Sequence, residues 1–203
     1  LASTTATTQA DIDKATLTAT LNAQNKIYDG NNSASVSYGD DRIGQDVLVV
    51  SGTATFSDKN AATGKTVTAT GLALTGTDAG NYELASTTAT TQADIDKATL
   101  TATITAQNKI YDGNTSASVS YGDDRIGQDV LVVSGTATFS DKNAGSNKTV
   151  IVNGLTLSGA DAGNYVLAAT TATDTADISK AQAIVTANSL NTVYNGKDQT
   201  VTG

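Results

Sequence analysis

The stretch Lys26-Ile27-Tyr28-Asp29-Gly30-Asn31 organises this chain, because it occurs three times at a fixed interval. It returns as Lys109-Ile110-Tyr111-Asp112-Gly113-Asn114 and, in diverged form, as Thr192-Val193-Tyr194-Asn195-Gly196-Lys197. The tyrosines are 83 residues apart in both intervals. Asp-Gly after an apolar, β-favouring run predicts a turn, since glycine accepts positive φ and aspartate caps free amides. We expect the motif to be structural, with each tyrosine ring filling the core of a small domain.

The period divides the 203 residues into two full repeats and two partial ones. Residues 1–14 are identical to residues 84–97, so we expect them to be the tail of a preceding repeat. The predicted divisions are the tail at 1–14, repeat 1 at 15–97, repeat 2 at 98–180 and the start of a third repeat at 181–203. Both ends are expected to be cuts through a longer array.

The composition argues against most chemistry. The chain lacks His and Cys, and with them the usual nucleophile–base pairs and zinc sites. Its net charge of −8 argues against nucleic acid and anionic membrane surfaces as partners. We therefore predict a monomeric, non-catalytic protein without a cofactor, which inserts into no membrane and has neighbouring repeats as its partners.

Alternating apolar and threonine residues predict about seven short strands in each repeat, with turns every 8–12 residues. The expected fold is all-β: tandem, small β-sandwich-like domains arranged end to end. Val47 to Val50 is apolar on both faces, which indicates a central strand. A β-grasp-like domain with one short helix is the alternative, and Asp40 to Asp46 has room for one helical turn.

The junction between the repeats has no flexible linker. Ala93 and Ile95 are apolar on odd positions, whereas Leu100 and Ile104 are apolar on even ones. This change of parity across residues 96–99 indicates that the chain leaves one core and enters the next. We expect a short, stiff joint, held mainly by the direct connection.

Two clusters of aspartates are the candidate calcium ligands. They are Asp40, Asp41 and Asp46 in repeat 1, and Asp123, Asp124 and Asp129 in repeat 2. The spacing of a calcium loop is missing, and Arg42 and Arg125 lie inside the clusters. A solvated loop with a local ion pair is therefore the preferred interpretation, and calcium binding the alternative.

The aromatic residues of repeat 1 could form either a sugar-binding face or part of the hydrophobic core. Tyr28, Tyr38, Phe56 and Tyr82 would suit a sugar-stacking face, but four aromatics in an 83-residue domain are more typical of a core.

Three spaced motifs resemble the YDG-domain repeat. They are Ile27 to Asn31, Gly52 to Asn60 and Leu74 to Tyr82, and they recur at Ile110 to Asn114, Gly135 to Asn143 and Leu157 to Tyr165. Residues 181–203 are more similar to the start of the related MBG domain, with Val185-Thr186-Ala187-Asn188 and Tyr194-Asn195-Gly196. The resemblance implies tandem domains of large, secreted bacterial surface proteins, often adhesins of the filamentous-haemagglutinin type. It implies no catalytic residues.

Together these observations predict a structural stalk of a bacterial cell-surface adhesin, which projects a distant adhesive region from the cell. The alternative is a binding module, in which the repeats themselves hold glycans or like repeats on a neighbouring cell. If the chain is a stalk, other regions of the same protein are the expected contacts to host or bacterial glycans and proteins.

Overall fold

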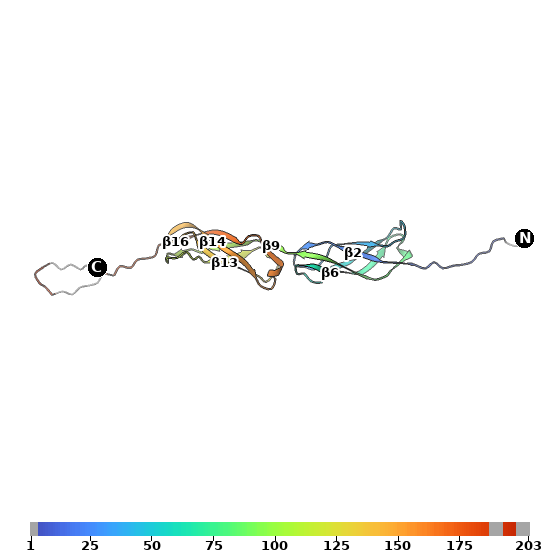
Figure 1. Cartoon of the computed structure of the whole chain (residues 1–203), viewed down its shortest axis with the longest axis horizontal. Coiled ribbons are helices and arrows are strands. Elements are labelled where there is room, and N and C mark those ends of the chain that lie inside the picture. The colour runs from blue at the N-terminus through green and yellow to red at the C-terminus, as the bar shows by residue number, and fades with distance from the viewer. Residues whose placement is uncertain (1–3, 187–192, 198–203) are drawn as a thin grey trace.

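The computed structural model describes residues 4–186 and 193–197, and its strands form two domains that lie in line along the long axis of the molecule (Figure 1). We call residues 15–97 domain 1 and residues 98–180 domain 2. The described ends of the chain leave the two domains on opposite sides (Figure 1). The N-terminal end precedes domain 1, and the C-terminal end follows domain 2.

The two domains have the same strands in the same order. Domain 1 contains β1 (Ala15–Leu17), β2 (Ala19–Ala23), β3 (Lys26–Ile27), β4 (Val36–Asp40), β5 (Val49–Phe56), β6 (Ala62–Thr75), β7 (Tyr82–Leu84) and β8 (Thr88–Asp96). Domain 2 contains β9 (Ala98–Leu100), β10 (Ala102–Ala106), β11 (Lys109–Ile110), β12 (Val119–Asp123), β13 (Val132–Phe139), β14 (Gly145–Ser158), β15 (Tyr165–Leu167) and β16 (Thr171–Ser179). Only Lys97 separates β8 from β9, so the chain passes from one domain to the next without a linker.

Each domain is built on one four-stranded sheet, whose order in domain 1 is β3-β8-β6-β5. A parallel pair, β1 with β7, and an antiparallel pair, β2 with β4, complete the domain. The inward side chains of these strands meet in one core, which contains Leu17, Val67 and Ile95. The alternation of the sequence thus produces the mainly-β, tandem-domain fold that it predicts.

The interpretation of Val47 to Val50 as a central strand is wrong. Strand β5 begins at Val49 and lies at the edge of the four-stranded sheet. The segment before it is a loop held by side chains: the Val47 amide donates to Asp78 Oδ2 at 2.7 Å, and Arg42 Nη1 donates to the Leu48 carbonyl at 2.8 Å. Leu48 and Val50 are buried while Val47 and Val49 are exposed, as an edge segment with one solvent-facing side requires.

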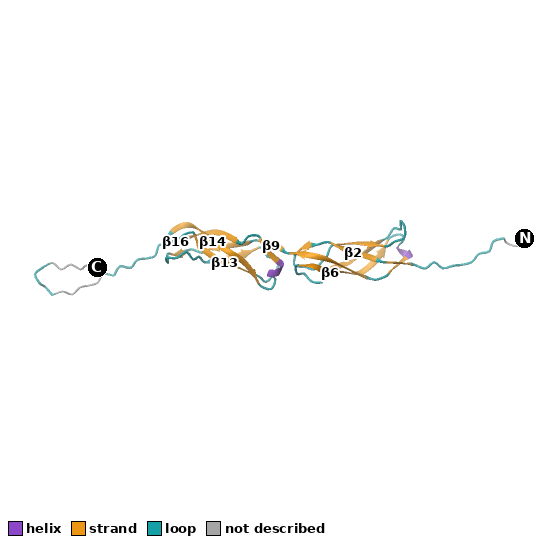
Figure 2. Ribbon diagram, in the orientation of Figure 1, coloured by secondary structure: helices purple, strands orange, loops and turns teal. Residues whose placement is uncertain are grey.

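Helical structure is confined to two 3₁₀ turns in the described residues, η1 (Ala79–Asn81) and η2 (Ala162–Asn164). Figure 2 shows η1 at the free end of domain 1 and η2 at the joint between the domains. The alternative prediction placed a short helix between Asp40 and Asp46. That segment is instead a turn, closed by the Asp46 amide on the Ile43 carbonyl at 3.3 Å. No helix in the described part of the chain could cross a membrane.

The predicted third repeat falls largely outside the described residues. Of residues 181–203, the structure describes 181–186 and 193–197, and neither segment forms a strand. Tyr194 is exposed, and the following turn is present, with Gly196 at φ +75°. The similarity of this segment to an MBG domain remains a prediction.

Candidate functional site: the joint between the domains

The Tyr-Asp-Gly stretch forms a tight turn at the end of its domain. Lys26 Nζ donates to Asp29 Oδ1 at 2.8 Å, and the same oxygen accepts the Asn31 amide at 3.1 Å. Gly30 has φ +81°, which a side chain would disfavour. The Tyr28 amide donates to the Asp96 carbonyl at 2.8 Å, so the last residue of β8 anchors the tyrosine where the chain leaves domain 1.

The Tyr28 side chain lies between the two domains. Its hydroxyl donates to Asp129 Oδ2 of domain 2 at 2.8 Å. Its ring meets the Tyr165 ring edge to face, with centroids 5.5 Å apart and planes at 75°. Only 2% of Tyr28 is exposed. The residue that the sequence marks most strongly is therefore an interdomain contact.

Asp129 is the centre of the joint. Its Oδ2 accepts a second hydrogen bond, from the Tyr165 hydroxyl at 2.6 Å, and its Oδ1 accepts Lys59 Nζ at 3.0 Å. Lys59 also reaches Asp161 Oδ1 at 3.5 Å and lies 5.7 Å from the centroid of the Tyr28 ring. A buried carboxylate with three donors, two of them from the other domain, holds the domains in one mutual orientation.

A second contact involves η2 and the loop before β6. Asn164 Oδ1 accepts the Ala61 amide at 2.9 Å, and Asn164 Nδ2 donates to Asn60 Oδ1 at 3.3 Å. Asn164 is buried, with 4% of its surface exposed. The joint thus has two anchor points, at Asp129 and at Asn164, and two points resist rotation better than one.

The joint perturbs the pKa values of the groups inside it. Burial disfavours the charged form of Asp129, but hydrogen bonds from Tyr165, Tyr28 and Lys59 outweigh this effect and lower the pKa of the carboxyl. Burial, followed by the hydrogen bond to Asp129, raises the pKa of Tyr165 to about 12. Burial also raises the pKa of Tyr28. The ionised aspartate and the neutral phenols are the forms that stabilise the joint.

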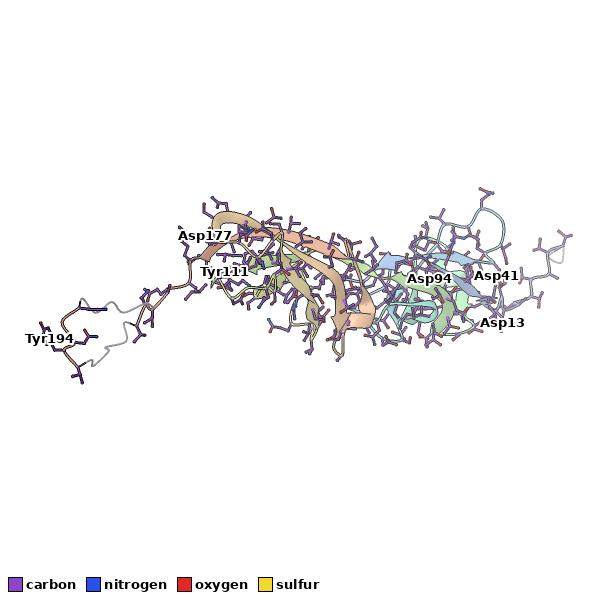
Figure 3. The ribbon with its side chains drawn as sticks, turned by 60° about the vertical axis from the view of Figure 1, so that its left-hand side comes forward. Asp13, Asp41, Asp94, Tyr111, Asp177 and Tyr194 are labelled. Atoms are coloured by element: carbon purple, nitrogen blue, oxygen red, sulfur yellow. The ribbon has the colours of Figure 1, made fainter. Side chains whose placement is uncertain are left out.

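Each domain has both surfaces of the joint, one around the Tyr-Asp-Gly turn and one around the aspartate and asparagine at its other end. In the described residues, one copy of each surface is buried in the joint and the other copy is open, so the two copies can be compared. Tyr111, the counterpart of Tyr28, lies at the end of domain 2 that faces away from domain 1, near Asp177 (Figure 3). It is 38% exposed, against 2% for Tyr28. Asn81, the counterpart of the buried Asn164, is exposed. The prediction that each tyrosine fills the core of its own domain thus needs a correction: Tyr28 is part of the buried core, but the neighbouring domain completes its burial, and Tyr111 stays partly open.

Comparison with known families also finds two consecutive units in the chain. The sequence model of the YDG domain matches residues 12–90 and again residues 96–173, which together are more than half of the chain. The chain belongs to the YDG domain family. No curated protein and no solved structure matches the chain. The two in-line domains of Figure 1 are thus two consecutive YDG domains.

The candidate calcium ligands of the YDG domains have separate partners. Asp40 binds the Arg42 guanidinium through both carboxylate oxygens, at 2.7 and 2.5 Å, and this pairing lowers the pKa of Asp40. Asp41 accepts the Thr18 amide at 2.7 Å, and Asp46 accepts the Tyr82 hydroxyl at 2.6 Å.

The same partners recur in the second YDG domain. Asp123 binds Arg125, Asp124 accepts the Thr101 amide, and Asp129 lies in the joint. The described residues include no group of three acidic side chains placed to hold a metal ion. The fold therefore directs the three carboxylates of each cluster to different tasks.

The residues considered for a sugar-stacking face lie mostly inside. Tyr28, Phe56 and Tyr82 are buried, and Tyr38 is half-buried. Phe56 lies beneath Lys26, whose ammonium is 5.7 Å from the ring centroid. This arrangement is that of core and joint residues.

Sequence reasoning missed most of the joint. Lys59, Asn60, Asp161, Asn164 and Tyr165 received no role, although they lie in the Ser-Asp-Lys-Asn and Asp-Ala-Gly-Asn-Tyr motifs. A signal was present: the two repeats differ at 17 positions, and none of the joint residues is among them.

Proposed function

We propose that this chain is a non-catalytic spacer, a stalk segment of a secreted bacterial surface adhesin that holds an adhesive region away from the cell. Two consecutive YDG domains support the repeated-module part of this proposal. The resemblance described above motivates the surface location.

The observation that carries the proposal is the joint. A spacer works by keeping its length, so its domains must not swing. Here the connection is a single residue, Lys97, and the contacts at Asp129 and Asn164 join the two domains in addition. The strands β8 and β16 contain nine residues each, about 30 Å at ~3.3 Å per residue, so each added domain lengthens the molecule substantially.

The glycan-binding alternative has no comparable support. Of the four aromatic residues that would form a sugar platform in domain 1, three are buried. The spacer is therefore the function that we favour.

Small-angle X-ray scattering tests the proposal. The native chain should scatter as a monomeric rod with a narrow distribution of interdomain distances. Insertion of four glycines after Lys97 should broaden that distribution while each domain keeps its own stability. A native chain whose distribution is already as broad as that of the glycine variant would refute the spacer mechanism.

A further inference from the structure

The free end of domain 1 contains an open cavity of about 440 Å³. Its lining includes Ile43, Asp46, Asn81 and Tyr82, together with residues 12–15. Ile43, Asp46, Asn81 and Tyr82 have counterparts 83 positions later that lie in the joint. Asp129 and Tyr165 contact the Tyr28 side chain, Asn164 contacts Ala61, and Ile126 lies beside Gly30. We call the cavity at the free end of domain 1 the socket.

The socket keeps the geometry of the occupied joint. The Tyr82 hydroxyl donates to Asp46 Oδ2 at 2.6 Å and accepts the Ile43 amide at 3.0 Å. In the occupied copy the Tyr165 hydroxyl makes the same two bonds, at 2.6 Å to Asp129 and 2.9 Å from the Ile126 amide. The site is therefore preorganised, so the binding of an occupant would cost little side-chain entropy in the socket.

The socket has the charge that its occupant requires. Asp46 and Asp78 correspond to Asp129 and Asp161, the two carboxylates that Lys59 contacts in the joint. Asp46 is half-buried, and its counterpart Asp129 is buried beneath Tyr28 and Lys59. A tyrosine hydroxyl and a lysine ammonium from the surface of another domain would give Asp46 and Asp78 the partners that Asp129 and Asp161 have in the joint.

From this we infer that the socket binds the Tyr-Asp-Gly and Asp-Lys-Asn end of another YDG domain, joined directly in front of domain 1 within the same chain. This inference rests on the proposed function, because it names the partner that would extend the rod in the N-terminal direction.

Residues 6–13 decide between a domain of the same chain and a second copy of the molecule. They repeat residues 89–96 of β8 letter for letter, yet they form no strand here. Ile12 is 98% exposed, whereas its counterpart Ile95 in β8 is 2% exposed. In domain 1, residues 95 and 96 pair with β3 and so position Tyr28. In a domain that precedes domain 1 in the same chain, residues 6–13 would form the strand that corresponds to β8. In a second copy of this chain, β16 already occupies that place in the docking domain, so residues 6–13 would remain unpaired. The repeat of the β8 sequence therefore favours a domain of the same chain.

An extended chain tests the inference. Placing a copy of residues 15–83 in front of Leu1 completes a third domain, since residues 1–14 repeat residues 84–97. Ser37→Thr within the added copy marks its peptide by mass at an exposed position. Nitration by tetranitromethane, located within each peptide by fragment-ion mass spectrometry, then reports the exposure of each tyrosine, including Tyr28 and Tyr38 in the same peptide.

We expect the added tyrosine to react as slowly as Tyr28, on the order of tenfold more slowly than Tyr111, because access to a buried ring requires opening of the joint. Asp46→Asn in the extended chain should restore the reactivity of the added tyrosine and leave Tyr28 protected by Asp129. If the added tyrosine reacts like Tyr111, or if Asp46→Asn changes nothing, the inference is wrong.

Two further outcomes separate the alternatives. In the native chain, a Tyr28 as reactive as Tyr111 would show that the joint itself does not form, and would refute the proposed function as well. Sedimentation of the native chain at rising concentration should show monomers. End-to-end dimers with a protected Tyr111 would assign the socket to a second copy and overturn the partner that we infer.

Discussion

Truncating Tyr28 and Tyr111 to alanine gives the sharpest measure of the joint, because the two tyrosines have nearly the same sequence around them. In the structure they differ in one respect: domain 2 covers Tyr28, and the described chain leaves Tyr111 partly open. The difference between the two variants therefore isolates what the neighbouring domain contributes.

The expected magnitude follows from the contacts. Lowering the exposed fraction from 38% to 2% hides roughly 55–90 Å² of a side chain of about 150–250 Å². At about 25 cal/mol per Å² this burial contributes about 1.5–2 kcal/mol. The hydrogen bond to the Asp129 carboxylate adds about 1.5–3 kcal/mol. Tyr28→Ala should therefore cost about 3–5 kcal/mol more than Tyr111→Ala.

Urea unfolding of the full chain, followed by circular dichroism, measures this difference. For a slope of about 2 kcal/mol per M, the midpoint of the affected transition should fall by about 2 M more for Tyr28→Ala than for Tyr111→Ala. Tyr28→Phe is the matched control, since it removes the hydroxyl and keeps the ring. Equal losses in the two alanine variants, within about 1 kcal/mol, would show that the neighbouring domain does not bury Tyr28.

Three other predictions follow from the same contacts. Asp129→Asn should cost about 2–3 kcal/mol more than Asp46→Asn in thermal unfolding, since the Asp129 carboxylate binds Lys59 and Tyr28 of the other domain and Asp46 binds no group there in the described chain; equal costs would argue against the joint. The stability gap between wild type and Tyr28→Ala should shrink in acid and in strong alkali, which melting curves from pH 2 to pH 12 would check. The pKa of Asp129 is lowered by folding, so its contribution is present above about pH 4 and lost as the pH falls; the pKa of Tyr165 is raised to about 12, so its contribution is complete below about pH 10 and lost as the pH rises toward 12. Millimolar calcium should leave the melting temperature unchanged, because the aspartates of each cluster have separate protein partners; a rise of several degrees that a chelator reverses would contradict this.

Local sequence was sufficient to predict most of the fold. Alternation assigned the inward residues of β2 and β8, and the Asp-Gly signal located the turn whose Gly30 has φ +81°. Both depend on interactions within a few residues or on the two-residue period of a strand. The edge strand β5 was the exception, since side chains distant in sequence, Arg42 and Asp78, hold the loop before it.

The site could not be predicted in this way. The same aspartate cluster suggested calcium from its composition, and only the fold shows that Asp40, Asp41 and Asp46 point to three different partners. A cluster in sequence is a cluster in space only if the backbone directs its side chains to one point, and these loops do not.

What the sequence determined by itself is the period, most of the strands, the turn chemistry and the family. What only the tertiary structure decided is which surfaces meet. Tyr28 and Tyr111 lie in identical hexapeptides, Lys-Ile-Tyr-Asp-Gly-Asn, and yet one tyrosine is buried and the other is partly open. No local pattern distinguishes them, because the burial of each ring depends on whether a second domain places an aspartate and a tyrosine against it.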